Sequence, residues 1–293
     1  MLPKEILKKI RRIEIKTSRM VTDIFAGQYH SVFKGKGMEF DEVREYQPGD
    51  EIRSIDWNVT ARMGHPFVKK FVEERQLTVM LMMDASGSSY FGSAGQFKSE
   101  IAAELCSVLA FSAIKNNDRV GLIIFSDRIE KFIPPRKGLR HVLRVVREVL
   151  YHSPKGKGTD IKLALEYLNR VMRKRAVCFL ISDFFSRGFQ QQLRIVNKRH
   201  DCIAMTITDP RERELPEAGI IHMQDAETGE EFYVDTTSRA VRQTFETAGR
   251  RMLENRARIL RQAGVDVVDI RTDRPYTEEL FRFFRKREKR LRF

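Results

Sequence analysis

Residues 79–88, Val79-Met80-Leu81-Met82-Met83-Asp84-Ala85-Ser86-Gly87-Ser88, decide the fold. Five apolar residues in a row predict a strand that is buried on both faces, as in the middle of a parallel sheet. The strand ends on a carboxylate, and two hydroxyls follow at alternate positions. Ligands of open α/β sheets bind beyond the carboxyl ends of the strands, so we look for a binding site here first.

On either side of this strand, short apolar runs alternate with longer helical periods, which is typical of βαβ units. We expect strands at residues 77–83, 120–125, 129–133, 176–181, 202–207 and 265–270, with 129–133 forming an edge hairpin. Helices are expected at residues 97–114, 139–150, 161–172, 189–196, 239–262 and from 277 onward, and a second hairpin at 220–223 and 231–234. The predicted fold class is α/β, a doubly wound, mostly parallel sheet of the Rossmann type.

The residues before the sheet differ in sequence pattern from those that follow. Apolar side chains in residues 1–24 recur near a 3.6-residue period, which predicts an amphipathic helix with a basic outer face. Glycine and proline punctuate residues 27–75 and predict loops and short strands with little core. We therefore divide the chain into an N-terminal helix with a small β-rich lead-in, residues 1–76, and an α/β domain with a basic C-terminal helix, residues 77–293.

The lead-in contains the only tryptophan, in a segment that mixes acids with Arg53. We expect Arg53 to pair with Asp50 or Asp56, and Trp57 to fill the seam between the lead-in and the sheet. A docking surface is the functional alternative for this segment.

Composition narrows the class of protein. With 293 residues and 42% apolar side chains the chain can fill a packed core. Its longest apolar runs are about five residues against the roughly 20 that span a bilayer, and its first 20 residues lack the apolar stretch of a secretory signal. We expect a cytoplasmic protein. The cysteines, Cys106, Cys178 and Cys202, show no Cys-x-x-Cys spacing and support neither a disulfide framework nor a zinc ribbon.

The net charge of +14 invites a nucleic-acid partner. However, residues 282–293 hold seven basic side chains and one acid, so nearly half of the excess lies in this segment. Apolar side chains are interleaved with these charges: Leu280, Phe281, Phe283, Phe284 and Leu291. An amphipathic helix packed on the body, a membrane-surface segment and a nucleic-acid contact stay open for it, in that order.

Oxygen-bearing side chains follow the strands at three strand-to-helix junctions. They are Asp84, Ser86, Ser88, Thr159 and Asp183. Two carboxylates and three hydroxyls match the preference of a hard cation, Mg²⁺ or Mn²⁺. As the plain alternative, each aspartate caps a helix or a turn, and Thr159 is the N-cap of a helix that begins at Asp160. The joint occurrence of all five in order favours the metal site.

The set Asp84-x-Ser86-x-Ser88, Thr159 and Asp183 resembles the metal-ion-dependent adhesion site of von Willebrand factor A domains, and residues 118–127 and 158–161 resemble that fold as well. The segments 33–40, 43–50, 53–57 and 60–62 resemble the lead-in of the bacterial MoxR-associated family filed as domain of unknown function 58. The resemblance covers about residues 25–275.

This resemblance implies a von Willebrand A-like domain in which Ser86, Ser88 and Thr159 supply hydroxyl ligands. Asp84 and Asp183 would hold the metal directly or through water, and an acidic side chain of a partner would complete the shell. It also implies a MoxR-type AAA+ ATPase as partner. Lys157 departs from the family pattern, since a glycine is common there, and its cation would lower metal affinity.

Enzymatic alternatives have less support. A haloacid-dehalogenase-type phosphatase needs a second carboxylate two residues after the first, where this chain has Ser86. Residues 156–159 lack the spacing of a phosphate-binding loop, and the six histidines form no metal-binding motif. We therefore expect a non-enzymatic, metal-dependent adaptor. A basic nucleic-acid-binding or membrane-surface protein and, behind it, a phosphatase-like hydrolase remain alternatives.

Overall fold

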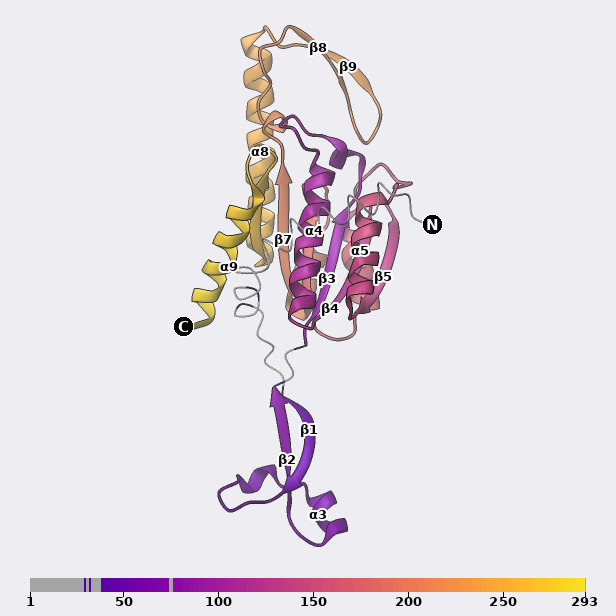
Figure 1. Ribbon diagram of the computed structural model, residues 1–293. Coiled ribbons are helices and arrows are strands. Elements are labelled where there is room, and N and C mark those ends of the chain that lie inside the picture. Colours follow the sequence, from indigo (N-terminus) through magenta and orange to yellow (C-terminus); the bar gives the residue numbers. More distant parts are fainter. Residues whose placement is uncertain (1–28, 30–31, 33–37, 74–75, 293) are drawn as a thin grey trace. The chain divides into compact units, whose positions relative to one another are not determined.

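The structure, a computed structural model, describes residues 29, 32, 38–73 and 76–292 (Figure 1). The chain divides into two compact units, Phe33–Leu77 and Met1–Val32 together with Thr78–Phe293. The helix predicted for residues 1–24 lies outside the described residues.

The larger unit is built on a six-stranded sheet of order β10-β7-β6-β3-β4-β5. Its strands are β3 (Thr78–Asp84), β4 (Arg119–Phe125), β5 (Ile129–Arg136), β6 (Val177–Ser182), β7 (Asp201–Thr208) and β10 (Asp266–Arg271). Five are parallel, and β5 pairs antiparallel with β4 at the edge. The predicted fold class, a doubly wound and mostly parallel sheet, is confirmed. Crossover connections bring the carboxyl ends of β3 and β6 side by side, where the predicted site lies.

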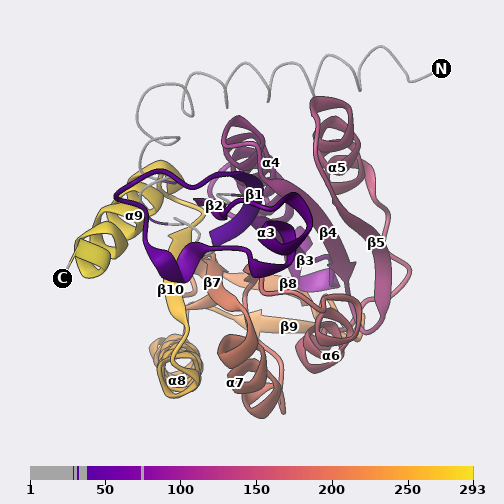
Figure 2. The same ribbon diagram turned by 90° about the horizontal axis from the view of Figure 1, so that it is seen from below.

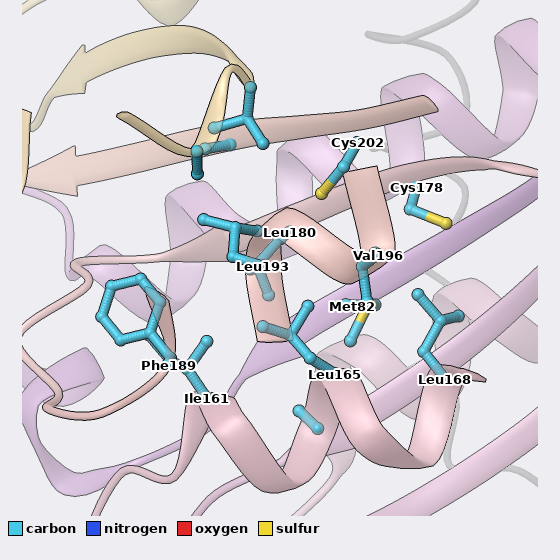
Figure 3. Packing of buried hydrophobic residues seen from close by; sticks show 14 of the residues in the cluster. Met82, Ile161, Leu165, Leu168, Cys178, Leu180, Phe189, Leu193, Val196 and Cys202 are labelled. Atoms are coloured by element: carbon cyan, nitrogen blue, oxygen red, sulfur yellow. The ribbon is translucent and has the colours of Figure 1, made fainter. Parts of the chain in front are cut away.

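Helices cover both faces of this sheet (Figure 2). They are α4 (Lys98–Lys115), α5 (Leu139–Tyr151), α6 (Ile161–Val171), α7 (Gln190–Arg199), α8 (Arg239–Ala263) and α9 (Tyr276–Arg292). The α6–α7–α8 face holds an apolar core in which Leu165, Leu168 and Leu193 pack on strand residues such as Leu180 (Figure 3). Each fully buried leucine contributes about 1.5–3 kcal/mol to folding, so this face fixes the sheet beneath the site.

The C-terminal helix packs on the body of the larger unit. Its apolar residues Leu280, Phe283 and Phe284 are buried. Arg287 bonds to Asp201 and Asp266 at the start of neighbouring strands. The first of the three alternatives for this segment is therefore confirmed for its apolar face. Among the described helices, none combines the length and the apolar character that crossing a bilayer requires.

The smaller unit contains an antiparallel pair, β1 (Met38–Glu45) and β2 (Phe67–Glu73), the 3-10 helix η2 (Ile52–Ser54) and a short helix, α3 (Trp57–Met63). The sequence had indicated only loops and strands here, and α3 is a correction. It forms because the Asp56 carboxylate accepts hydrogen bonds from the backbone N–H groups of Asn58 and Val59.

The expected pairing of Arg53 is also wrong. Asp50 accepts both of its ion-pair hydrogen bonds from Arg44, at 2.6 and 2.8 Å, and Asp56 caps α3 and lies 3.5 Å from Lys69. Trp57 is 67% exposed, so its ring belongs to no core of the smaller unit, and the expected seam with the sheet stays a prediction.

The second hairpin is present as predicted, with β8 (Ile220–Gln224) paired to β9 (Glu231–Asp235). It arches over the carboxyl ends of the sheet strands (Figure 1). Two 3-10 helices, η3 (Gly87–Tyr90) and η4 (Pro210–Glu212), begin just after β3 and β7. The hairpin turn, η3 and η4 thus gather at one edge of the sheet.

Candidate metal site

Four loops meet at this edge of the sheet. They are residues 84–88 after β3, 156–160 before α6, 183–186 after β6 and 225–229 in the β8–β9 turn. The Gly87 N–H donates to the Lys157 carbonyl at 2.8 Å, and the Ser186 hydroxyl donates to the Thr159 carbonyl at 3.2 Å. These two bonds join the first three loops to one another.

Asp84 is held in a fixed orientation at the end of β3. Its Oδ1 accepts the Ser86 N–H at 2.9 Å, and its Oδ2 accepts the Ser182 hydroxyl at 2.6 Å. The side chain is buried, and burial together with the nearby charge of Asp183 raises the pKa of Asp84 to about 6. A cation that approaches Asp84 therefore stabilises its charged form.

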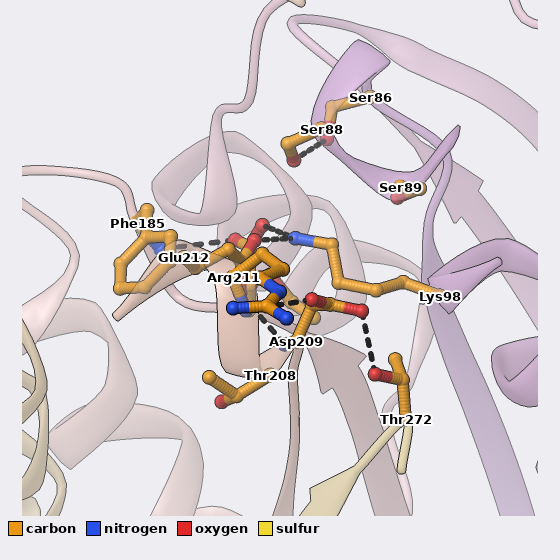
Figure 4. A network of polar contacts seen from close by, with 12 residues as sticks. Ser86, Ser88, Ser89, Lys98, Phe185, Thr208, Asp209, Arg211, Glu212 and Thr272 are labelled. Carbon is orange, nitrogen blue, oxygen red and sulfur yellow. Dashed lines mark hydrogen bonds and ion pairs between the residues drawn. The ribbon is translucent and has the colours of Figure 1, made fainter. Parts of the chain in front are cut away.

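Ser86 and Ser88 point toward each other. Their hydroxyl oxygens lie 3.1 Å apart (Figure 4). Ser86 is fully buried, and Ser88 is partly exposed on the rim. Because the two hydroxyls are neighbours, a single small ion can meet both.

The negative charge of Asp183 is balanced by a lysine, whereas the charge of Asp84 is not. Its Oδ2 accepts from the Lys98 ammonium at 2.8 Å and its Oδ1 from the Phe185 N–H at 3.1 Å. Burial by itself would raise the pKa of Asp183, but Lys98 and the Phe185 N–H outweigh it and the pKa is lowered. Arg256 of α8 also donates to the Asp183 backbone carbonyl, at 3.0 Å.

Lys98 is one residue of the candidate site that the sequence did not predict. Its side chain is 3% exposed and also donates to Glu212 of η4 (Figure 4). A lysine at the start of a helix is ordinarily solvated, so the pattern alone carries no signal for it. Lys157 is exposed, and its carbonyl accepts the Gly87 N–H; that its cation lowers metal affinity stays a prediction.

Thr159 is not a helix cap. Asp160 caps α6, accepting the Leu163 N–H at 2.8 Å. The Thr159 hydroxyl instead donates to the Glu227 carboxylate, at 2.8 Å, in the β8–β9 turn. Glu227 is a second residue that the sequence analysis missed, because no local pattern joins residues 68 positions apart.

A further strand-end carboxylate, Asp209, has a structural role. It is fully buried after β7 and accepts hydrogen bonds from Ser93, Arg211 and Thr272 (Figure 4). These bonds lower the pKa of Asp209 against the opposing effect of burial, which is the largest single contribution. With its oxygens occupied in this way, Asp209 fastens the loops behind the site.

The structure gathers all five predicted residues around this rim, and their chemistry fits a hard divalent cation. The donors are all oxygen, and the charge of Asp84 lacks the lysine that Asp183 has. In the described part of the chain, no three His, Cys, Asp or Glu side chains lie close enough together to hold a metal. The candidate site contributes only two such residues, because its other three donors are hydroxyls.

Known proteins are similar to this chain over most of its length. An uncharacterized protein of Mycobacterium tuberculosis (strain ATCC 25618 / H37Rv) is 32% identical over 285 residues, which is 96% of this chain and 89% of that protein. Among solved structures, BatB from Bacteroides thetaiotaomicron is 17% identical over 73% of this chain and 99% of that chain, with a TM-score of 0.46. The VWA domain of SpRpn10 is 12% identical over 70% of this chain and 93% of that chain, with a TM-score of 0.38. The family model described as protein of unknown function DUF58 matches residues 42–255, and the chain belongs to that family.

Proposed function

We propose that this chain is a non-enzymatic adaptor that binds Mg²⁺ or Mn²⁺ at the candidate site and uses the ion to hold an acidic residue of a partner protein. The observation that carries the proposal is the donor set itself, five oxygen-bearing side chains on one rim with Asp84 uncompensated. When bound, the cation supplies a local positive charge that attracts a carboxylate.

The five residues of the candidate site supply two kinds of ligand. The hydroxyls of Ser86, Ser88 and Thr159 offer neutral ligands, while Asp84 and Asp183 supply the negative charge, directly or through water. Ser182 and the Ser86 N–H hold Asp84 in place, and Lys98 holds Asp183. Neutral ligands leave net positive charge on the ion, so a further carboxylate still binds to it.

The partner that we propose is a MoxR-type AAA+ ATPase, on the strength of the sequence resemblance. We place the interaction in the cytoplasm, with the basic outer face of α9 available for peripheral contact with a membrane surface. Arg287 and Arg290 are engaged with Asp266, so the remaining basic side chains of α9 would make such a contact.

A hydrolase role for Asp84 has weaker support. The side chain is 3% exposed, and each of its oxygens accepts a hydrogen bond. A nucleophilic carboxylate needs access to its substrate, so this environment favours a supporting role around a cation.

The test is a calorimetric titration of Mn²⁺ into the full chain. We expect one ion per chain, and we expect Asp84→Ala and Ser86→Ala to abolish binding. Ser153→Ala, which changes an exposed serine away from the rim, serves as the matched control and should bind as the unaltered chain does. Circular dichroism establishes that each variant is folded. Equal Mn²⁺ affinity in all four proteins would refute the proposal.

A further inference from the structure

We propose that the β8–β9 turn carries an internal ligand of the site, Glu227, which takes the place of the partner's carboxylate until the hairpin lifts. The inference rests on the proposed function and adds a competitor within the chain. Partner binding then requires displacement of the hairpin turn from the rim.

Glu227 already contacts one of the five donors. Its Oε1 accepts the hydrogen bond of the Thr159 hydroxyl at 2.8 Å. Glu227 is otherwise exposed, so burial of apolar surface does not explain its position. Glu227 is thus bonded to one of the proposed ligands of the cation. It occupies the position that an acidic ligand of that cation would take.

The turn is pre-shaped to present Glu227. The Asp225 carboxylate accepts the N–H groups of Glu227 and Thr228, at 2.9 and 2.7 Å, and the Asp225 carbonyl accepts the Gly229 N–H at 2.8 Å. These bonds within the turn lower the pKa of Asp225, those of Thr228 contributing most. The turn therefore keeps its shape whether or not it contacts the rim.

The turn is seated directly on the loop that contains the two serines. A Cβ added at Gly87 would lie 2.1 Å from the Ala226 carbonyl oxygen, so the glycine is what lets the two backbones approach. Gly87 lies between Ser86 and Ser88, and Glu227 follows Ala226. This contact and the Glu227–Thr159 bond fix the turn on both sides of the candidate site.

The rest of the hairpin is lightly packed. Every residue of β8 and β9 is at least partly exposed. A cavity of about 270 Å³ separates Met223 and Ala226 of the hairpin from Phe245 and Met252 of α8. At its base, Thr236 bonds to the Gly219 carbonyl at 2.6 Å. An element with so little buried apolar surface opens at lower free energy than the sheet does.

The deciding experiment compares Glu227→Gln with Glu230→Gln, a second glutamate of the same turn. Glutamine keeps the hydrogen bond to Thr159 and removes the charge. We expect Glu227→Gln to weaken Mn²⁺ binding roughly tenfold and Glu230→Gln to leave it unchanged, as measured by calorimetry. Acetate, as a probe carboxylate, should bind to the Mn²⁺-loaded Glu227→Gln protein more tightly than to the unaltered one.

Hydrogen exchange supplies a readout of the hairpin itself. Mn²⁺ should slow amide exchange in residues 220–235 of the unaltered chain and of Glu230→Gln, but not of Glu227→Gln. If Mn²⁺ binds the unaltered chain and the two variants behave alike, the internal ligand is overturned while the proposed function stands. If Mn²⁺ does not bind at all, both are overturned.

Discussion

Asp84 and Asp183 are two buried carboxylates of one site with opposite pKa shifts. The difference arises because, of these two carboxylates, only Asp183 accepts from Lys98, so the uncompensated charge of the pair is concentrated on Asp84. In the absence of metal, a proton is the cation that relieves it. Protons and Mg²⁺ or Mn²⁺ therefore compete for the same oxygen atoms.

This competition gives a pH prediction for Asp84. Its folded-state pKa, about 6, lies above the ordinary value of an aspartate, 3.8. The folded state therefore holds the proton more tightly, and stability that is fully present below pH 4 is lost as the pH rises through 6. The loss is on the order of 3 kcal/mol. Urea unfolding in EDTA at pH 4 and pH 7 measures it against Asp84→Asn, whose stability should lack this component. Equal pH dependence in the two proteins would contradict the raised pKa.

At the scale of elements, the junction before α6 separates two roles that sequence alone left open. Asp160 caps the helix and Thr159 faces the hairpin turn. The two positions are adjacent, but their side chains act on different parts of the molecule.

We predict opposite outcomes for the two alanine variants. Asp160→Ala should lower the free energy of unfolding by about 1 kcal/mol, the typical loss for an N-cap, because the Leu163 N–H is left without its acceptor. Thr159→Ala should leave stability within about 0.5 kcal/mol of the unaltered chain, as is usual away from caps and cores, but should lose Mn²⁺ binding. Denaturant titration and calorimetry check the pair, and a large stability loss in Thr159→Ala would show a structural role instead.

The elements were predictable to the extent that apolar runs and helical periods encode them. The runs at 79–83 and 177–181 mark strands buried on both faces, and their polar ends located Asp84 and Asp183. The short helix α3 was not predictable in this way, because a single capping carboxylate starts it and it buries no residue of its own. The roles of Lys98 and Glu227 were also not predictable, since both side chains bond to partners far away in the sequence.

At the scale of the whole molecule, one buried ammonium joins three segments. Lys98 at the start of α4 bonds to Asp183 after β6 and to Glu212 of η4. The net charge of +14, by contrast, is spread along the chain, with nearly half of the excess in residues 282–293. The buried positive charge of Lys98 therefore matters more to the site than the overall excess.

Replacing Lys98 by methionine should destabilise the metal-free chain by about 3–5 kcal/mol, because the buried Asp183 and the partly buried Glu212 lose their partner. The same change should increase the rise in melting temperature that Mn²⁺ produces, since the ion then meets an additional uncompensated carboxylate. Lys174→Met, at an exposed position before β6 and away from the rim, is the control and should change neither quantity. Thermal unfolding with and without Mn²⁺ measures both, and a loss of the Mn²⁺ effect in Lys98→Met would contradict this account.

The three cysteines of the sheet and α4 give the molecule an internal reporter. Cys106, Cys178 and Cys202 are free and buried, and burial raises the pKa of each thiol, that of Cys202 to about 12. Because the thiolate is the reactive form, a maleimide or disulfide reagent modifies them only when the sheet opens. The rate of labelling therefore measures how often the sheet opens. It does not change when only the hairpin lifts from the rim.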